Sequence, residues 1–573
     1  MLTKLSGVKK LLISIPFIIL LISSIFGFYF LSYSTSKVET IYFPSVLPDL
    51  APNDVTITSG RIFYPSNYVN GRQYPVVIYV HGFQVTKETD LRLILELTKR
   101  GIFALAVDLP GHGQTKSILG PYFWKVVIGA IDYIYKRPDI FNLSAVGVCG
   151  HSMGGWASFL AMGYEAKRQN RINVSVSWAG IFNTTSFRED VLTSGSFDND
   201  LRNIKVDNSL FYNSKYLYDH NPANYYTNNS LGAQPAPDKF GPRILVIQGN
   251  KDSIVDPSQA LEANNTLGKN CSLYMINGED HLLLTNHAII RTIQYFELHY
   301  FGVQESEAEI SSNLTYLNVY LSYFFSLIGL FFSILSCVFL VWYYFQGNTE
   351  IPQKFKPKGW KFTIITILPY FGVLAIFWVL QSILFNVLLS LLISSIILGL
   401  YSLILYYFAN YEYISNSGFV KKATKEHNLF ALFAGFHLGL LATFGYWALS
   451  NYYSMLVFMP WNIDYFIYAF LYLIPIVFFN EFFWRKIIQD NVPIKNRWFK
   501  RLFMVIPIFF CGILFIELMN TSFLSIMAFA ITFLATSLTN IFIYSKYKSI
   551  RATIIFALIP LAFIAGNCYF FFI

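Results

Sequence analysis

Charged residues are scarce in this chain of 573 residues, because Asp, Glu, Lys and Arg make up only 13% of it while apolar types make up 54%. So little charge excludes a wholly soluble protein and indicates membrane-embedded parts. Much of the net charge of +9 lies in loops between apolar stretches. It therefore needs no nucleic-acid partner to explain it.

Cysteine is also rare, and none of the five cysteines has the spacing of a metal or redox site. We interpret each as a small buried hydrophobic residue. The metalloprotease pattern H-E-x-x-H and the nucleotide-binding pattern G-x-x-x-x-G-K-[ST] are both absent from the sequence. We therefore expect no metal ion and no cofactor.

Long apolar runs stand at the beginning of the chain and throughout its second half. Residues 1–10 contain Lys4, Lys9 and Lys10, and residues 11–31 are apolar. A run of about 20 apolar residues crosses a bilayer core as a helix. No small-residue cleavage site follows, so we predict a retained signal anchor with a cytoplasmic N-terminus. The lipid bilayer is then a partner of the chain.

Residues 317–573 predict a polytopic membrane domain of about eight helices. The loops on one predicted side are rich in Lys and Arg, whereas those near 381–386, 450–464 and 520–522 contain neither. This asymmetry predicts a multi-pass cell-membrane protein whose C-terminus and central domain are extracytoplasmic. The predicted spans are 317–345, 362–380, 387–408, 429–449, 465–484, 502–519, 523–543 and 552–572.

Residues 40–310 have the composition of a globular domain. Apolar runs such as Pro75–Val80, Phe103–Val107 and Arg243–Gln248 predict strands buried on both faces. Helical stretches between them predict a mostly parallel sheet with helices on both faces, an α/β fold. Residues 183–240, rich in Asn, Tyr and Ser, interrupt the alternation, so we expect a cap or lid there.

Glycosylation sequons in and just after this domain support its external location. The pattern N-x-[ST] marks surface positions of exported proteins, although it also arises by chance. It occurs at Asn142, Asn173, Asn183, Asn228, Asn264, Asn270 and Asn313.

The segment Val146–Gly155 reads V-G-V-C-G-H-S-M-G-G and contains G-x-S-x-G between a predicted strand and a predicted helix. In a nucleophile elbow this pattern turns so tightly that only glycine fits on either side of the serine. Here the glycines are Gly150 and Gly154, and the serine is Ser152. A glycine-rich turn with an idle serine is the alternative that the pattern alone leaves open.

Further motifs stand on both sides of the elbow in the same chain. They are His81-Gly82-Phe83, D-x-P-G-H-G from Asp108, G-N-K-D ending at Asp252, and E-D-H ending at His281. Together with the elbow they make residues 54–302 resemble the α/β-hydrolase superfamily. The resemblance implies an α/β-hydrolase fold and a triad in the chain order serine, acid, histidine.

The resemblance assigns chemical roles to these residues. Ser152 becomes the nucleophile, His281 the general base, and Asp252 the acid that orients the base, with Asp256 as reserve. The backbone N–H groups of Phe83 and Met153 would form the oxyanion hole.

We therefore expect a membrane-bound serine hydrolase that cleaves an ester, thioester or amide through an acyl-serine intermediate. Its partners would be an acyl ester, lipid or peptide substrate. A hydrolase-fold acyltransferase, and a transporter or receptor with a hydrolase-like external domain, are the alternatives. No feature of the sequence indicates an oligomeric state.

The membrane half contains one sharp polar feature, F-N-E-F-F-W-R ending at Arg485. Glu481 and Arg485 stand four residues apart and should pair on one helix face. The segment is similar to the E-E-x-x-x-R motif of the CAAX-processing and bacteriocin-immunity family of intramembrane proteases. Asn480 replaces the first glutamate, and no histidine follows Arg485. These departures favour a pair without chemistry that snorkels to the membrane interface.

Overall fold

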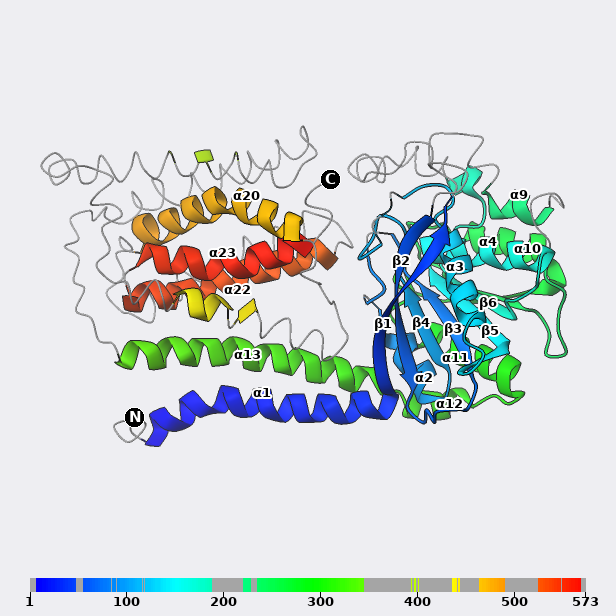
Figure 1. Ribbon diagram of the computed structural model, residues 1–573, viewed down its shortest axis with the longest axis horizontal. Helices are drawn as coiled ribbons and strands as arrows, with labels where there is room; N and C mark the ends of the chain where they lie inside the picture. The colour runs from blue at the N-terminus through cyan, green and yellow to red at the C-terminus, as the bar shows by residue number, and fades with distance from the viewer. Residues whose placement is uncertain are drawn as a thin grey trace, which may run out of the picture. The chain divides into compact units, whose positions relative to one another are not determined.

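The computed structural model describes residues 7–47, 55–187, 220–227, 234–344, 463–489, 524–547 and 549–567, apart from 84, 89, 116 and 118, with short pieces between 393 and 443. The chain forms two compact units, of which one extends from Ser24 to Tyr323 and the other contains the helices of the C-terminal half (Figure 1). The predicted spans 362–380 and 502–519, and most of 387–408 and 429–449, lie outside the described residues.

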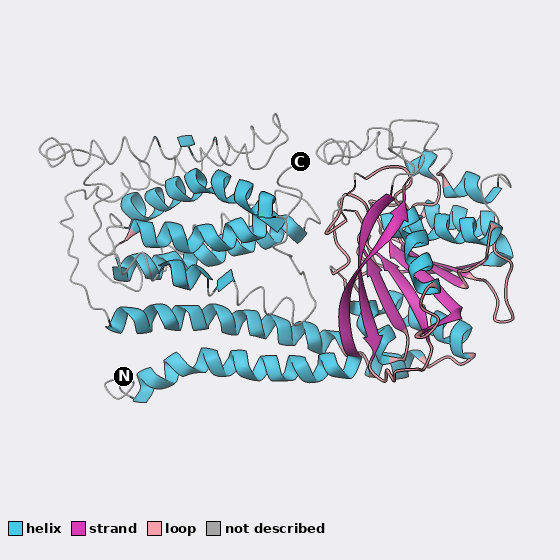
Figure 2. Cartoon of the chain, in the orientation of Figure 1, coloured by secondary structure: helices cyan, strands magenta, loops and turns pink. Residues whose placement is uncertain are grey.

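An eight-stranded sheet organises the first unit, and its strands are drawn in magenta in Figure 2. The strand order is β1-β2-β4-β3-β5-β6-β7-β8. β2 is antiparallel to both β1 and β4, and all pairs from β4 to β8 are parallel, which confirms the predicted mostly parallel sheet. The strands are β1 (Thr35–Val46), β2 (Val55–Pro65), β3 (Tyr74–Val80), β4 (Phe103–Val107), β5 (Phe141–His151), β6 (Val174–Trp178), β7 (Ile244–Gly249) and β8 (Cys271–Ile276).

Helices cover both faces of this sheet, as the sequence predicts. The helices α2 (Arg92–Lys99) and α11 (Asn286–Phe301) pack together on one face (Figure 1). On the other face lie α3 (Lys125–Tyr135), α4 (Met153–Lys167) and α10 (Ser258–Leu267). Both faces of the central strands are therefore apolar, which explains why these strands read as continuous apolar runs.

The first strand was not predicted from the sequence. β1 begins directly after α1 (Gly7–Ser34), within the stretch between the predicted anchor and the predicted domain start at residue 40. Only its second half alternates, with Ile41 and Phe43 buried and Tyr42 exposed. Its first half carries Lys37 and Glu39, whose side chains form an ion pair at 2.8 Å. A polar, exposed edge strand of this kind lacks the alternation of apolar and polar residues from which a strand is predicted.

The described part of the C-terminal half is helical. Its helices are α13 (Tyr316–Tyr344), α20 (Ile463–Phe482), α22 (Leu524–Tyr547) and α23 (Ile550–Asn567), which begin within a few residues of the predicted spans. Among the described residues, two helical stretches are long and apolar enough to cross a membrane, Ser14–Ser34 and Glu307–Cys337, the second including α12 (Glu307–Ser312).

Two of the sequons are poor sites for a glycan. The Asn270 side chain is buried and its amide nitrogen donates to Gln234 Oε1 at 2.8 Å. The Asn183 amide nitrogen donates to Glu262 Oε1 at 2.7 Å. Since a glycan is attached through this nitrogen, glycosylation would break both contacts. The sequons at these positions fit chance occurrence better than modification.

A buried ion cluster ties together β2, the loop after β3 and the end of β4. Lys87 Nζ lies 2.5 Å from Asp108 Oδ2 and 3.1 Å from Glu88 Oε1, and Arg61 Nη1 lies 3.5 Å from the same glutamate oxygen. Burial alone would raise the pKa of Asp108, but the Lys87 ammonium holds it below its ordinary value. Asp108 therefore stays ionised inside the domain.

We predict that Lys87→Met lowers the free energy of unfolding of this domain by about 3–5 kcal/mol at neutral pH, because it takes the lysine cation away from the buried Asp108 carboxylate. The sign of the pH dependence follows from the lowered pKa of Asp108. The stability from this pair is present above the unfolded aspartate pKa of about 3.9 and is lost as the pH falls through the folded value.

Unfolding of the purified full chain, followed by tryptophan fluorescence between pH 3 and pH 8, measures this effect. The exposed Lys136→Met is the matched control and should change the free energy by no more than about 0.5 kcal/mol. A Lys87→Met penalty of the same size at every pH would contradict the ion-pair interpretation.

Candidate functional site

Ser152 stands at a sharp turn between β5 and α4. Its backbone has φ 55° and ψ −117°, a conformation that residues other than glycine rarely adopt. A Cβ at Gly150 would lie 2.1 Å from Gly154 O, and a Cβ at Gly154 would lie 2.1 Å from Val80 O. Neither position has room for a larger residue, so the elbow brings the end of β3 into direct contact with the start of α4.

The His81-Gly82-Phe83 turn lies against this elbow. A Cβ at Gly82 would lie 3.3 Å from Ser152 Cβ. The His81 ring holds the turn, because Nε2 accepts from Leu109 N at 3.0 Å and Nδ1 donates to Gly82 O at 2.6 Å. Burial is the main cause that lowers the pKa of His81 to about 3, so the ring is neutral and its tautomer is set by these two bonds. Phe83 therefore follows a turn that is fixed beside Ser152.

Asp252 and His281 meet beyond the ends of β7 and β8. His281 Nδ1 lies 2.8 Å from Asp252 Oδ2, and this carboxylate is buried. The other carboxylate oxygen accepts from Ile254 N and Val255 N, each at 2.9 Å. Because the carboxylate accepts from Nδ1–H, the second ring nitrogen of His281 keeps its lone pair for a proton.

His281 lies beside the residue that precedes Ser152. The rings of His151 and His281 have centroids 4.9 Å apart, and His151 Nε2 donates to His281 O at 2.8 Å. Burial, with a smaller contribution from His281, lowers the pKa of His151 to about 4, so His151 is a neutral donor here. The structure thus brings serine, imidazole and carboxylate to one edge of the sheet.

Two residues that support this arrangement were not singled out in the sequence. Gln248 on β7 is fully buried and donates from Nε2 to Asp252 Oδ2 at 2.8 Å and to Val255 O at 3.0 Å. Arg92 donates from Nη1 to Leu283 O and Leu284 O, each at 3.1 Å, in the loop after His281. The sequence offered one signal for Gln248, because a glutamine near the end of an otherwise apolar strand needs a polar partner. It offered no comparable signal for Arg92.

The remaining predicted residues take other positions. Asp256 accepts from Ser258 N at 2.8 Å at the start of α10, so Asp252, and not the reserve acid, contacts His281. Met153 is buried and begins α4. Its backbone N–H therefore belongs to the N-terminus of a helix, where N–H groups have no partner within the helix and can bind an anion.

The described residues of the predicted cap insertion, 183–187, 220–227 and 234–240, are anchored to the sheet domain. Trp156 Nε1 on α4 donates to His220 O at 2.9 Å. Asn221 Nδ2 donates to Asn183 Oδ1 at 3.0 Å, so these two parts of the segment lie together. The short helix α9 (Pro222–Thr227) follows directly. The rest of 183–240 lies outside the described residues.

The polar pair of the membrane half is buried, so the predicted snorkelling to an interface is wrong. Arg485 Nε lies 2.9 Å from Glu481 Oε2, and the arginine side chain is 0% exposed. Its other nitrogens donate to Gln489 Oε1 at 2.6 Å and to Ser537 O at 3.2 Å on α22. Arg485 lies in a π-helical turn, Phe483–Gln489, and joins that turn to α22.

Sequence comparison gives two matches to this part of the chain. Residues 119–304 match the model of the prolyl oligopeptidase family (Peptidase_S9). A curated Bacillus subtilis (strain 168) protein named "Putative esterase YitV" is 28% identical over 95 residues, which cover 15% of this chain and 37% of that protein. The matched region is thus a little over a third of this relative's length.

Solved structures that are similar to part of this chain are distant in sequence. The Pyrococcus horikoshii acylaminoacyl peptidase is 16% identical, with 48% of this chain and 44% of that chain covered and a TM-score of 0.35. A Mycobacterium tuberculosis puromycin-hydrolysing peptidase is 18% identical, with 43% and 37% covered and a TM-score of 0.33. Residues 119–304 of the sheet domain are therefore similar to the prolyl oligopeptidase family, a family of α/β-hydrolases of the serine-hydrolase type.

Proposed function

We propose that the chain is a membrane-anchored serine hydrolase that cleaves an ester, thioester or amide through an acyl-Ser152 intermediate. One observation carries the proposal. A strained serine at the end of β5 directly follows His151, whose ring lies against an imidazole that is bonded to a buried carboxylate at 2.8 Å. Strained backbone of this kind occurs mainly at functional sites. The match to a family of hydrolases supports the same chemistry.

In the proposed mechanism Ser152 Oγ attacks the carbonyl carbon while His281 Nε2 takes the hydroxyl proton. Asp252 keeps the Nδ1–H tautomer and stabilises the imidazolium. The N–H groups of Met153 and Phe83 bind the oxyanion, and His281 returns the proton to the leaving group. Water then attacks the acyl-serine by the same route in reverse. Passing the acyl group to an alcohol instead would make the chain an acyltransferase.

For the membrane arrangement we propose a cytoplasmic N-terminus, an extracytoplasmic hydrolase domain and a multi-pass C-terminal half that ends outside. The apolar stretches Ser14–Ser34 and Glu307–Cys337 flank the sheet domain, and both are long enough to cross a bilayer. Two such stretches on either side of one domain keep that domain on a single face of the membrane. The loop charges of the sequence support the outer face.

We predict that Ser152→Ala abolishes labelling by a fluorophosphonate probe, because the alanine has no oxygen to phosphonylate. Gel fluorescence of the purified full chain measures the labelling. Ser158→Ala, on the same helix, should label like the parent chain. A membrane-impermeant version of the probe should label intact cells to the same extent as opened cells.

Labelling that survives in Ser152→Ala would remove Ser152 as the nucleophile. Absence of labelling in the parent chain would favour a receptor or transporter with a hydrolase-like binding domain. Labelling by the impermeant probe only after the cells are opened would contradict the external location.

We predict that Gln248→Leu lowers kcat about tenfold with little change in KM, because a hydrogen bond to a charged group contributes about 1.5–3 kcal/mol. Gln248→Glu should lower kcat further, since it places a second carboxylate against Asp252. Steady-state kinetics on a small chromogenic ester measure both effects.

The control variant is Gln259→Leu, which removes another buried glutamine that accepts from Phe182 N and Asn183 N. It should lower the unfolding temperature and leave kcat within about twofold of the parent. Equal kcat values for the Leu and Glu variants at position 248 would show that Gln248 only fills space.

A further inference from the structure

The first turns of α13 are bonded to the two helices that flank the catalytic loops. Glu96 Oε1 on α2 accepts from Thr315 N at 2.6 Å and from Tyr316 N at 3.0 Å, so this carboxylate caps the start of α13. One turn further along α13, the Tyr320 hydroxyl accepts from Leu91 N at 3.1 Å. Leu91 precedes α2 and Glu96 lies within it, so the first turns of α13 are bonded to α2 at two points, and Tyr320 is bonded at the N-terminal end of α2.

That end of α2 is the edge of the sheet that carries the site. α2 follows β3 and the His81 turn, and α11 begins five residues after His281, so both helices start at the carboxyl ends of the parallel strands. Leu91 binds Tyr320, and the next residue, Arg92, binds the carbonyls of Leu283 and Leu284. The consecutive residues Leu91 and Arg92 are thus hydrogen-bonded to α13 and to the loop after His281, respectively.

Apolar side chains are exposed in the loop after His281 and on the first turns of α13. Leu282 and Leu284, in the loop after His281, are 40% and 63% exposed. Leu317 and Leu321, one turn apart on α13, are 55% and 45% exposed. Exposed apolar residues that are contiguous with an apolar helix mark a contact with a membrane or another apolar partner.

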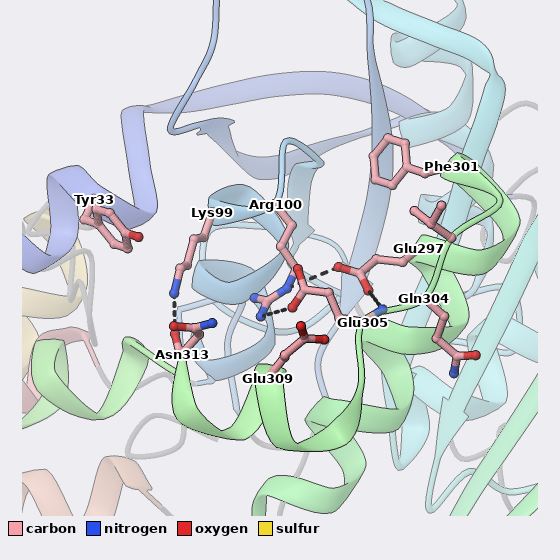
Figure 3. A pocket seen from close by; sticks show the side chains of 10 residues that line it. Tyr33, Lys99, Arg100, Glu297, Phe301, Gln304, Glu305, Glu309 and Asn313 are labelled. Carbon is pink, nitrogen blue, oxygen red and sulfur yellow. Dashed lines mark hydrogen bonds and ion pairs between the residues drawn. The ribbon is translucent and has the colours of Figure 1, made fainter.

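The opposite edge is different in character. A pocket of about 520 Å³ lies at the C-terminal ends of α2 and α11 (Figure 3). Five charged side chains line it, and most of them pair with one another. Arg100, for example, lies 3.3 Å from both a Glu297 and a Glu305 oxygen. The lining residues are Tyr33, Lys99, Arg100, Glu297, Phe301, Val303, Gln304, Glu305, Glu309 and Asn313.

The length of α13 agrees with a membrane surface at the apolar edge. The residues of α13 beyond Tyr323, up to Tyr344, span about 31 Å at 1.5 Å per residue, close to the thickness of a bilayer core of about 30 Å. The bilayer would then begin one turn beyond Tyr320, the residue that is bonded to the site edge.

We propose, on the basis of the membrane-anchored hydrolase above, that the Ser152 site opens toward the membrane surface and takes as substrate an amphiphilic acyl ester held in that surface. The acyl chain leaves the bilayer along the exposed leucines of α13 and the loop after His281. The ester group thereby reaches Ser152 without crossing water. A freely soluble ester reaches Ser152 from water and does not use this apolar path.

The experiment uses the full chain reconstituted in phosphatidylcholine vesicles and two esters of the same chromophore, p-nitrophenyl acetate in solution and p-nitrophenyl palmitate dissolved in the vesicles. The ratio of the two kcat/KM values is measured. We expect Leu284→Glu to lower the palmitate-to-acetate ratio about tenfold, because a carboxylate opposes contact with the apolar layer, and Leu284→Ser to lower it less. The control is Leu261→Glu on α10, whose leucine is 50% exposed, and the ratio should stay unchanged.

Each outcome bears on one hypothesis. A ratio that falls only in the position-284 variants supports the proposal. A parent chain that hydrolyses acetate and not palmitate, or equal ratios for Leu284→Glu and Leu261→Glu, overturns it and leaves the hydrolase function intact. A parent chain that hydrolyses neither ester and is not labelled by fluorophosphonate overturns the proposed function and this proposal with it.

Discussion

The whole site depends on a backbone contact between Gly154 and the end of β3. A Cβ at Gly154 would lie 2.1 Å from Val80 O and 2.7 Å from His81 O. No side chain fits between the two segments, so the loop after β3 and the turn after β5 share one small volume. The strained backbone of Ser152 is stable there because the neighbouring strands and helices fix both ends of the turn. Any larger residue would separate Ser152 from the Phe83 loop.

The sequence predicts the parts of this architecture that have a local cause. Buried strands produce uninterrupted apolar runs, so the strand Phe103–Val107 was located at its observed bounds. Glycine at positions 150 and 154 has a steric cause that can be read from the elbow pattern alone. Of the two candidate acids, Asp252 and the reserve Asp256, it is Asp252 whose carboxylate contacts His281.

Other features of the structure depend on contacts between residues that are far apart in the sequence. Gln248 reaches Asp252 through a turn whose shape depends on the Ile254 and Val255 amides. Arg92 meets a loop nearly two hundred positions later. Arg485 was expected at an interface, yet its partners include a carbonyl of α22. A charged residue stays buried when donors and acceptors of another segment satisfy it, and one segment's sequence does not contain that information.

A tether alone would not orient a hydrolase domain on a membrane. Glu96 is fully buried and its two oxygens accept from Thr315, Tyr316 and Arg100, so it joins α13, α2 and the far edge of the domain in one bonded group. Charge-assisted bonds of this kind contribute about 1.5–3 kcal/mol each. With Tyr320 as a second attachment one turn away, rotation of the domain about α13 would break bonds at two points. The bonds at Glu96 and Tyr320 therefore hold the first turns of α13 against α2, the helix that starts at the same edge of the sheet as Ser152 and His281.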